Sequence, residues 1–113
     1  MDKNYIKNID METVFTLSDL VSYQQGQVVS KTLAQNDAIS LTIFAFDKDE
    51  EISSHESNGD AMVIALAGEG EIIIEGKSYI LKKGETIVMP AKKPHAVYAK
   101  EQFKMVLVVV FPQ

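Results

Sequence analysis

The chain has 113 residues, a length that holds one domain and excludes a (β/α)8 barrel or a protein built from two nucleotide-binding halves. It contains no cysteine, which excludes disulfides, thiolate nucleophiles, iron–sulfur clusters and sulfur-based zinc sites, so nitrogen and oxygen atoms would have to hold any metal. The formal net charge is -5 and every basic residue is a lysine. We therefore expect no nucleic-acid partner, because neutralising phosphates requires a positive surface.

Membrane association and export are not expected either. The longest apolar runs, Met105 to Phe111 among them, have seven residues, whereas a membrane-spanning helix needs about 18. The segment Met1 to Tyr5 has no apolar signal core. We expect a cytoplasmic protein with no membrane partner.

Residues 1–27 are predicted to form an amino-terminal arm. The segment Thr16 to Val21 favours a short helix, with Thr16 as its cap, Asp19 in its first turn and Gly26 ending the segment. The alternative is an irregular arm whose apolar side chains cover one end of the domain. Neither interpretation assigns chemistry to the arm.

Residues 28–113 are predicted to form one all-β domain, because runs of β-branched and aromatic residues follow one another at short intervals. The expected strands are residues 28–33, 38–46, 62–66, 71–74, 78–81, 86–89, 95–99 and 103–111. Gly76 permits a positive φ between two of these runs and predicts a hairpin there. No long helical period follows residue 27, which argues against a βαβ architecture and favours a sandwich or barrel.

The segment from Gly84 to His95 has a specific spacing: a glycine, five residues, Pro90, and a histidine five positions later. This spacing resembles the second motif of the cupin superfamily, G-x5-P-x-G-x2-H-x3-N. Lys92 stands where that motif has its second glycine, and Ala99 stands where it has asparagine. The resemblance implies a cupin-type antiparallel β-barrel, also described as a jelly roll or double-stranded β-helix.

The segment from Ser53 to Gly68 is similar to the first cupin motif, G-x5-H-x-H-x3,4-E-x6-G, in a reduced form. With Gly68 as the final glycine and His55 as the second histidine, Ser53 takes the place of the first histidine and Ala61 that of the glutamate. Two of the four usual metal ligands are therefore missing. The resemblance leaves His55 and His95 as the candidate metal ligands.

Asp60 is the candidate third ligand. Side chains alternate along a strand, so Asp60 faces outward if Ala61 faces inward. A bulge at Asn58–Gly59 would turn Asp60 back toward the interior. His55, His95 and Asp60 would then form a two-histidine, one-carboxylate set suited to a divalent metal. The alternative is that Asp60 is a turn residue.

Small-molecule binding in the barrel, with one weakly held divalent metal (iron, manganese, nickel or zinc), is the preferred functional hypothesis. The predicted ligand-binding residues are His55, His95, Ser53, Ala61, Val63 and Met89. The adjacent Lys92–Lys93 would attract an anionic ligand to the barrel mouth. The alternative is a metal-dependent enzyme of the dioxygenase or isomerase class, its two-histidine site completed by Asp60, water or substrate.

The strand at residues 103–111 is apolar on both faces, more than a half-exposed strand should be. A partner subunit would cover the second face, and the cupin resemblance also implies a homodimer. The alternative is that the amino-terminal arm covers it.

Overall fold

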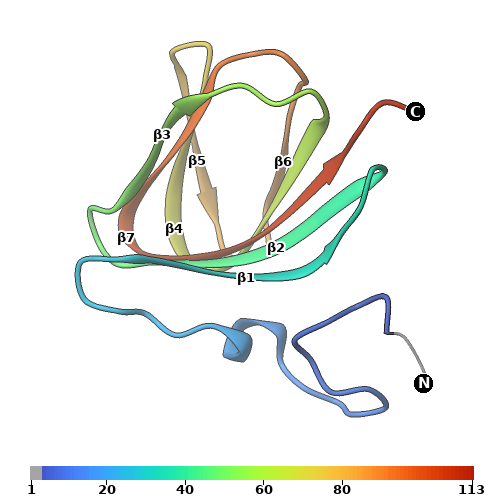
Figure 1. Cartoon of the computed structure of the whole chain (residues 1–113). Helices are drawn as coiled ribbons and strands as arrows, with labels where there is room; N and C mark the ends of the chain where they lie inside the picture. Colours follow the sequence, from blue (N-terminus) through green and yellow to red (C-terminus); the bar gives the residue numbers. More distant parts are fainter. Residues whose placement is uncertain (1–3) are drawn as a thin grey trace.

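The computed structural model describes residues 4–113, so the first three residues of the predicted arm lie outside the described part. One 3-10 helix precedes seven strands (Figure 1). The elements are η1 (Leu17–Leu20), β1 (Val28–Gln35), β2 (Ile39–Phe46), β3 (Glu51–His55), β4 (Asp60–Ile74), β5 (Lys77–Lys82), β6 (Thr86–Met89) and β7 (His95–Val110). The predicted all-β fold is confirmed.

Strands β4 and β7 are long, antiparallel to each other, and shared by both halves of an open barrel (Figure 1). One half has the order β1-β2-β7-β4-β6 and uses the last part of β7 and the first part of β4. The other half has the order β3-β7-β4-β5 and uses the remaining parts. All pairings are antiparallel, so the two shared strands hold both halves around one interior.

The long strands bend where glycine allows the two backbones to approach closely. Gly68 has a φ of 75°, and a Cβ there would lie 1.8 Å from the carbonyl oxygen of Gln102. A Cβ at Gly70 would lie 2.6 Å from the ring of Phe103. The sequence pattern predicted two separate strands in each of these regions. That division was wrong, because the break in the pattern marks a bend within a continuous strand.

The interior between the two halves is apolar and closely filled. Its largest fully buried side chains include Phe46, Phe103, Ile72, Met89, Met105 and Val63. The rings of Phe46 and Phe103 have centroids 5.8 Å apart, a separation typical of favourable aromatic pairs. This core fixes the strands whose ends carry the candidate site.

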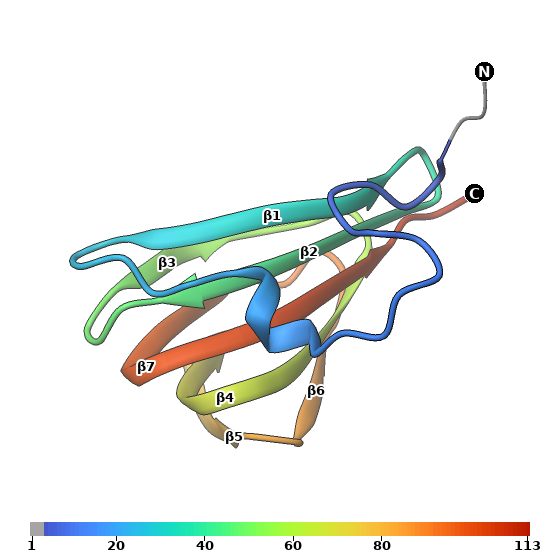
Figure 2. The ribbon, with the colours of Figure 1, turned by 90° about the horizontal axis from the view of Figure 1, so that it is seen from below.

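The amino-terminal arm lies across the outer face of the barrel (Figure 2). Its Val21 packs in a second apolar cluster with Ile43 and Ala45 of β2, and the ammonium of Lys104 in β7 donates a hydrogen bond of 2.7 Å to the carbonyl of Ser18. The arm therefore covers part of the outer face of β7. For this face the sequence left two possible covers, a partner subunit or the arm.

Among residues 4–27 of the arm, only one turn is helical. The 3-10 helix η1 begins after Thr16, whose side chain makes no capping hydrogen bond, so the predicted cap was wrong. Instead the carbonyl of Thr16 accepts the N–H of Asp19 at 3.0 Å. Gly26, with a φ of 68°, lies in the turn before β1 and not at the end of the helix.

Within residues 4–113 no helix has the length and apolar character that crossing a membrane requires. A cytoplasmic location stays a prediction.

The turn between β4 and β5 confirms the predicted hairpin. Glu75 and Gly76 both have positive φ, 50° and 80°, as a tight two-residue hairpin turn requires. The N–H of Glu75 donates to the carbonyl of Pro94 at 2.9 Å, which ties this turn to the loop before β7.

Strand β3 was not predicted, because Ile52 is its only apolar residue.

Candidate functional site

Two histidines from distant parts of the chain meet at the mouth of the barrel. His55 ends β3 and His95 begins β7, and the two residues lie directly opposite each other in the β3–β7 pair. Their ring centroids are 4.4 Å apart in an edge-to-face arrangement. The structure therefore brings together the two residues that the sequence singled out.

Each imidazole ring is held by a backbone carbonyl two residues earlier. Nδ1 of His55 lies 2.9 Å from the carbonyl oxygen of Ser53, and Nδ1 of His95 lies 3.1 Å from that of Lys93. A carbonyl oxygen only accepts hydrogen bonds, so Nδ1 carries the hydrogen in both rings. In the neutral form each Nε2 then has a free lone pair, which is the tautomer that binds metals or accepts a hydrogen bond from a ligand.

The two histidines differ in exposure. His95 is buried, with 4% of its surface exposed, whereas His55 is exposed. Burial lowers the pKa of His95, the nearby charge of His55 lowers it further, and the hydrogen bond to Lys93 opposes both effects in part. The lowered pKa of His95 favours the neutral form, which can donate a lone pair.

The other two cupin-motif positions offer little to a metal. Ser53 is exposed and lies in the irregular stretch between Ile52 and His55, where the register of β3 shifts. Ala61 is 1% exposed and packs in the core with Val63 and Met89. Of the predicted ligand-binding residues, Ala61, Val63 and Met89 belong to the apolar interior. The two histidines lie at its polar rim.

The predicted third metal ligand does not join the histidines. Asp60 is exposed, and its Oδ1 accepts the N–H of Ala91 at 2.8 Å. Among residues 4–113 no group of three His, Cys, Asp or Glu side chains is arranged to hold a metal. The predicted bulge is not the reason for Gly59: a Cβ there would lie 2.3 Å from the carbonyl oxygen of Val110, so glycine is needed for close packing.

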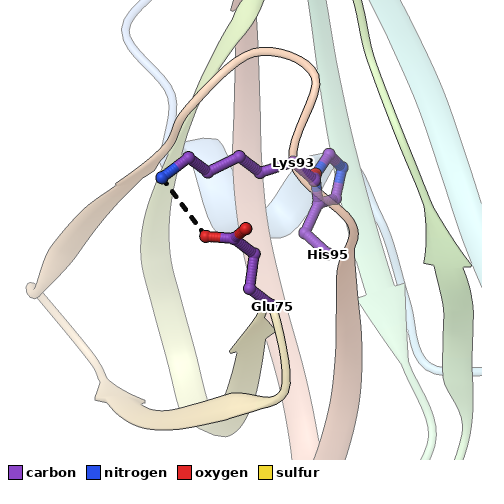
Figure 3. Close-up of polar contacts among 3 residues, drawn as sticks. All are labelled: Glu75, Lys93 and His95. Carbon is purple, nitrogen blue, oxygen red and sulfur yellow. Dashed lines mark hydrogen bonds and ion pairs between the residues drawn. The ribbon is translucent and has the colours of Figure 1, made fainter.

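A surface hollow of about 510 Å³ lies between the edges of β5 and β6. Its polar side chains are Glu75, Lys77, Tyr79 and Lys93. Glu75 and Lys93 form an ion pair of 3.2 Å that bridges two loops beside His95 (Figure 3). Of these four residues, only Lys93 was predicted from the sequence to attract a ligand, although residues 77, 79 and 81 alternate as residues on one face of a strand do.

Comparison with known proteins agrees with this architecture. A family profile described as a cupin domain matches residues 42–111, which is more than half of the chain. The chain belongs to the cupin family. This confirms the resemblance and the barrel fold that the two motifs predicted.

Several solved structures are similar over most of the chain. A conserved protein of unknown function from Streptococcus pyogenes is 47% identical, with a TM-score of 0.96, over 98% of this chain and 97% of that one. A cupin superfamily protein from Desulfitobacterium hafniense is 31% identical, with a TM-score of 0.91, over 95% and 98% of the two chains. A cupin 2 conserved barrel domain protein from Leptotrichia buccalis is 45% identical, with a TM-score of 0.83, over 85% of this chain and 47% of that one. A comparison with curated proteins gave no match.

Proposed function

We propose that this cupin binds a small molecule at the barrel mouth around His55 and His95, with a divalent metal held weakly by the same two rings. The observation that carries the proposal is the histidine pair itself, with centroids 4.4 Å apart and both Nδ1 atoms engaged by carbonyls. Two polar groups converging beside an apolar interior are the usual composition of a small-molecule site.

The donor set fits a weakly held metal. Both rings leave Nε2 free to bind a metal. Ala61, however, supplies no donor atom, and the carboxylate of Asp60 accepts a hydrogen bond from Ala91. Two imidazoles favour nickel or zinc over manganese or iron. A metal bound there would act as a Lewis acid toward an oxygen of the ligand. His95, buried and neutral, would hold it on the inner side, and His55 would hold it on the exposed side.

The alternative function is a metal-dependent enzyme of the dioxygenase or isomerase class. It requires a third donor, and with Asp60 facing outward this donor would be water or the substrate. In both histidines Nε2 is free to bind a metal. Near-stoichiometric metal in the purified protein would therefore favour this alternative.

Elemental analysis of protein purified without a histidine tag tests the metal part of the proposal. We expect nickel or zinc to be bound after reconstitution, and to be lost in His55→Gln and in His95→Gln. Asp60→Asn is the matched control, because it keeps the acceptor for Ala91 and should leave the metal content unchanged. Circular dichroism checks that each variant folds. Metal retained by both histidine variants would contradict the site.

Native mass spectrometry tests the small-molecule part. We expect an organic molecule to co-purify with the parent protein, or to be taken up from a ligand library, and to be lost in His55→Gln. Binding that is the same in the parent protein and in both histidine variants would reject this part of the proposal.

We also propose that two copies associate through an outer-face patch made of Met62, Val88, Val108 and Val110. Met62 lies opposite Val88 in one pair and opposite Val108 in the other. Met62, Val88 and Val110 are 41%, 48% and 56% exposed, and the arm leaves them uncovered. Contiguous apolar surface of this kind is typical of association sites.

The oligomeric state, measured by light scattering after size exclusion, tests this association. We expect the parent protein to be a dimer and Met62→Lys to be a monomer. Ile80→Lys is the matched control, since Ile80 is 42% exposed but lies on β5. A monomeric parent protein, or equal behaviour of the two variants, would contradict the interface.

A further inference from the structure

Four side chains form a single row across the inner face of one half of the barrel. Lys77 lies opposite Ile74 in the β4–β5 pair, Ile74 lies opposite His95 in the β4–β7 pair, and His95 lies opposite His55. Directly opposite residues share a face of the sheet. The row therefore runs from a lysine, over an apolar side chain, to the histidine pair.

The strand spacing sets the scale of this row. Neighbouring strands are about 4.8 Å apart, so Lys77 and His95, two strands apart, begin about 10 Å from each other. Ile74 between them packs against the apolar core. A ligand that reaches from the lysine to the histidines would therefore be about 10 Å long, with an apolar middle.

The hollow of about 510 Å³ lies at the lysine end of the row. Ile74 and Ile87 supply its apolar floor, and both also pack against the core. Tyr79, which lies opposite the fully buried Ile72, adds an aromatic wall. The hollow thus has an apolar floor and an aromatic wall, and is able to hold a flat apolar group.

The charges around the hollow leave one positive charge uncompensated. Lys93 is paired with Glu75 at 3.2 Å, whereas the ammonium of Lys77 lies 5.3 Å from the centroid of the Tyr79 ring. Among residues 4–113 no salt bridge involves Lys77. The chain as a whole carries a formal charge of -5, so this local surplus is opposite in sign to the net charge of the chain and would favour anions.

We infer that the ligand is a small organic monoanion, a carboxylate on an aromatic or other apolar body, with its carboxylate at Lys77 and Lys93 and its body over Ile74 toward the histidine pair. This inference rests on the proposed function, because it names the ligand class of the same site. Glu75 competes with the ligand carboxylate for Lys93. Removing the charge of Glu75 therefore strengthens binding, and removing either lysine charge weakens it.

Titration of the metal-free protein with 2-naphthoate, followed by amide NMR signals, tests the inference. The neutral 2-naphthamide is the matched probe, with the same ring system and no charge. We expect 2-naphthoate to bind about fivefold more tightly and to shift the amide signals of Ile74 and Lys77. An effect of this size is what partly exposed charge pairs give.

Three variants sharpen the test. We expect Lys77→Met to weaken 2-naphthoate binding about two- to fivefold, and Glu75→Gln to strengthen it by a similar factor, as partly exposed ion pairs allow. Lys82→Met is the control, because Lys82 is an exposed lysine on the same strand and outside the hollow. Lys82→Met should leave the binding of both probes unchanged, and Lys77→Met and Glu75→Gln should change 2-naphthamide binding less than 2-naphthoate binding.

The outcomes separate this inference from the function on which it rests. Equal affinity for the two probes, no shift at Ile74 and Lys77, or equal effects of Lys77→Met and Lys82→Met would overturn the anion preference while leaving the histidine site intact. Unchanged metal and ligand binding in both histidine variants would overturn the proposed function itself.

Discussion

His95 lies directly opposite His55, and the edge of one ring faces the plane of the other at a centroid distance of 4.4 Å. The ring of His95 is buried and that of His55 is exposed, so solvent reaches mainly His55. The charge of His55 acts on His95 and contributes to the lowering of its pKa.

The pKa of His95 should lie below the ordinary value of about 6.5, since burial and the charge of His55 both lower it. His55→Gln removes the second cause and should raise the pKa of His95 toward its ordinary value. NMR titration of the imidazole signals in chelator-treated protein measures the pKa of His95 in the parent protein and in the His55→Gln variant. A pKa of His95 that does not change in the variant would show that the two rings are not coupled.

The lowered pKa of His95 also predicts how stability depends on pH. Near pH 6.5 and below, the unfolded chain binds a proton at this residue more readily than the folded protein does, so the free energy of unfolding decreases as the pH falls from about 6.5 toward the folded-state pKa. Urea unfolding of the metal-free protein at pH 7.5 and 5.5 measures this decrease, which should be smaller in His95→Gln. An equal pH dependence in the variant would contradict the assignment to His95.

Gly68→Ala should destabilise the barrel strongly. The added methyl would overlap the carbonyl oxygen of Gln102, and the φ of 75° disfavours any side chain, which together cost about 3–5 kcal/mol. Gly84→Ala is the matched comparison, with a φ of 86° and no atom within 4 Å of its Cβ, so only the backbone cost of about 1–2 kcal/mol applies. Urea unfolding distinguishes the two, and equal losses would mean that the close approach of β4 and β7 is not what requires Gly68.

Asp60→Ala should cost stability without affecting a metal. The variant leaves the N–H of Ala91 without its carboxylate acceptor, and one exposed hydrogen bond of this kind contributes about 0.5–1.5 kcal/mol. Thermal unfolding measures the loss, which should be absent in Asp60→Asn because the amide oxygen still accepts. Weaker zinc binding by Asp60→Ala would instead identify Asp60 as a ligand.

Lys104→Met should loosen the amino-terminal arm and leave the barrel folded. The Lys104 ammonium donates to the carbonyl of Ser18 and lies 5.0 Å from the centroid of the Tyr23 ring. Losing both contacts should raise the rate of proteolysis within the arm about fivefold. Lys100→Met, a change at an exposed lysine of the same strand, is the control. Equal cleavage rates would show that Lys104 does not hold the arm.

Local sequence patterns were sufficient to predict most of the fold. The alternation around Ala61 correctly placed Ala61 inside and Asp60 outside, and Gly76 correctly marked the hairpin. The bend at Gly68 was interpreted as a break between strands, because a glycine in a bend and a glycine in a turn have the same local appearance. Strand β3 was missed because its side chains are mostly exposed and polar.

The candidate site was predictable only where residues carry a recognisable spacing. The histidines stood out because they occupy motif positions, and the structure places them together. The row from Lys77 to His55 depends on the registers of three separate strand pairs, which no local pattern specifies. The ion pair of Glu75 with Lys93 depends on how two loops approach each other, and this is a tertiary property.

Because β4 and β7 each run through both halves, neither half has a complete set of strands of its own. Phe46 of β2 pairs with Phe103 of β7 across most of the domain sequence, so the chain must close a long loop before this contact forms. Folding should therefore be slow, on the order of milliseconds to seconds, as it is for barrels dominated by non-local pairings. Local opening of one half would also break the other, so hydrogen exchange in the centres of β4 and β7 should proceed only through global unfolding. The half that carries His55 and His95 and the half that carries β1 and β2 should therefore unfold together.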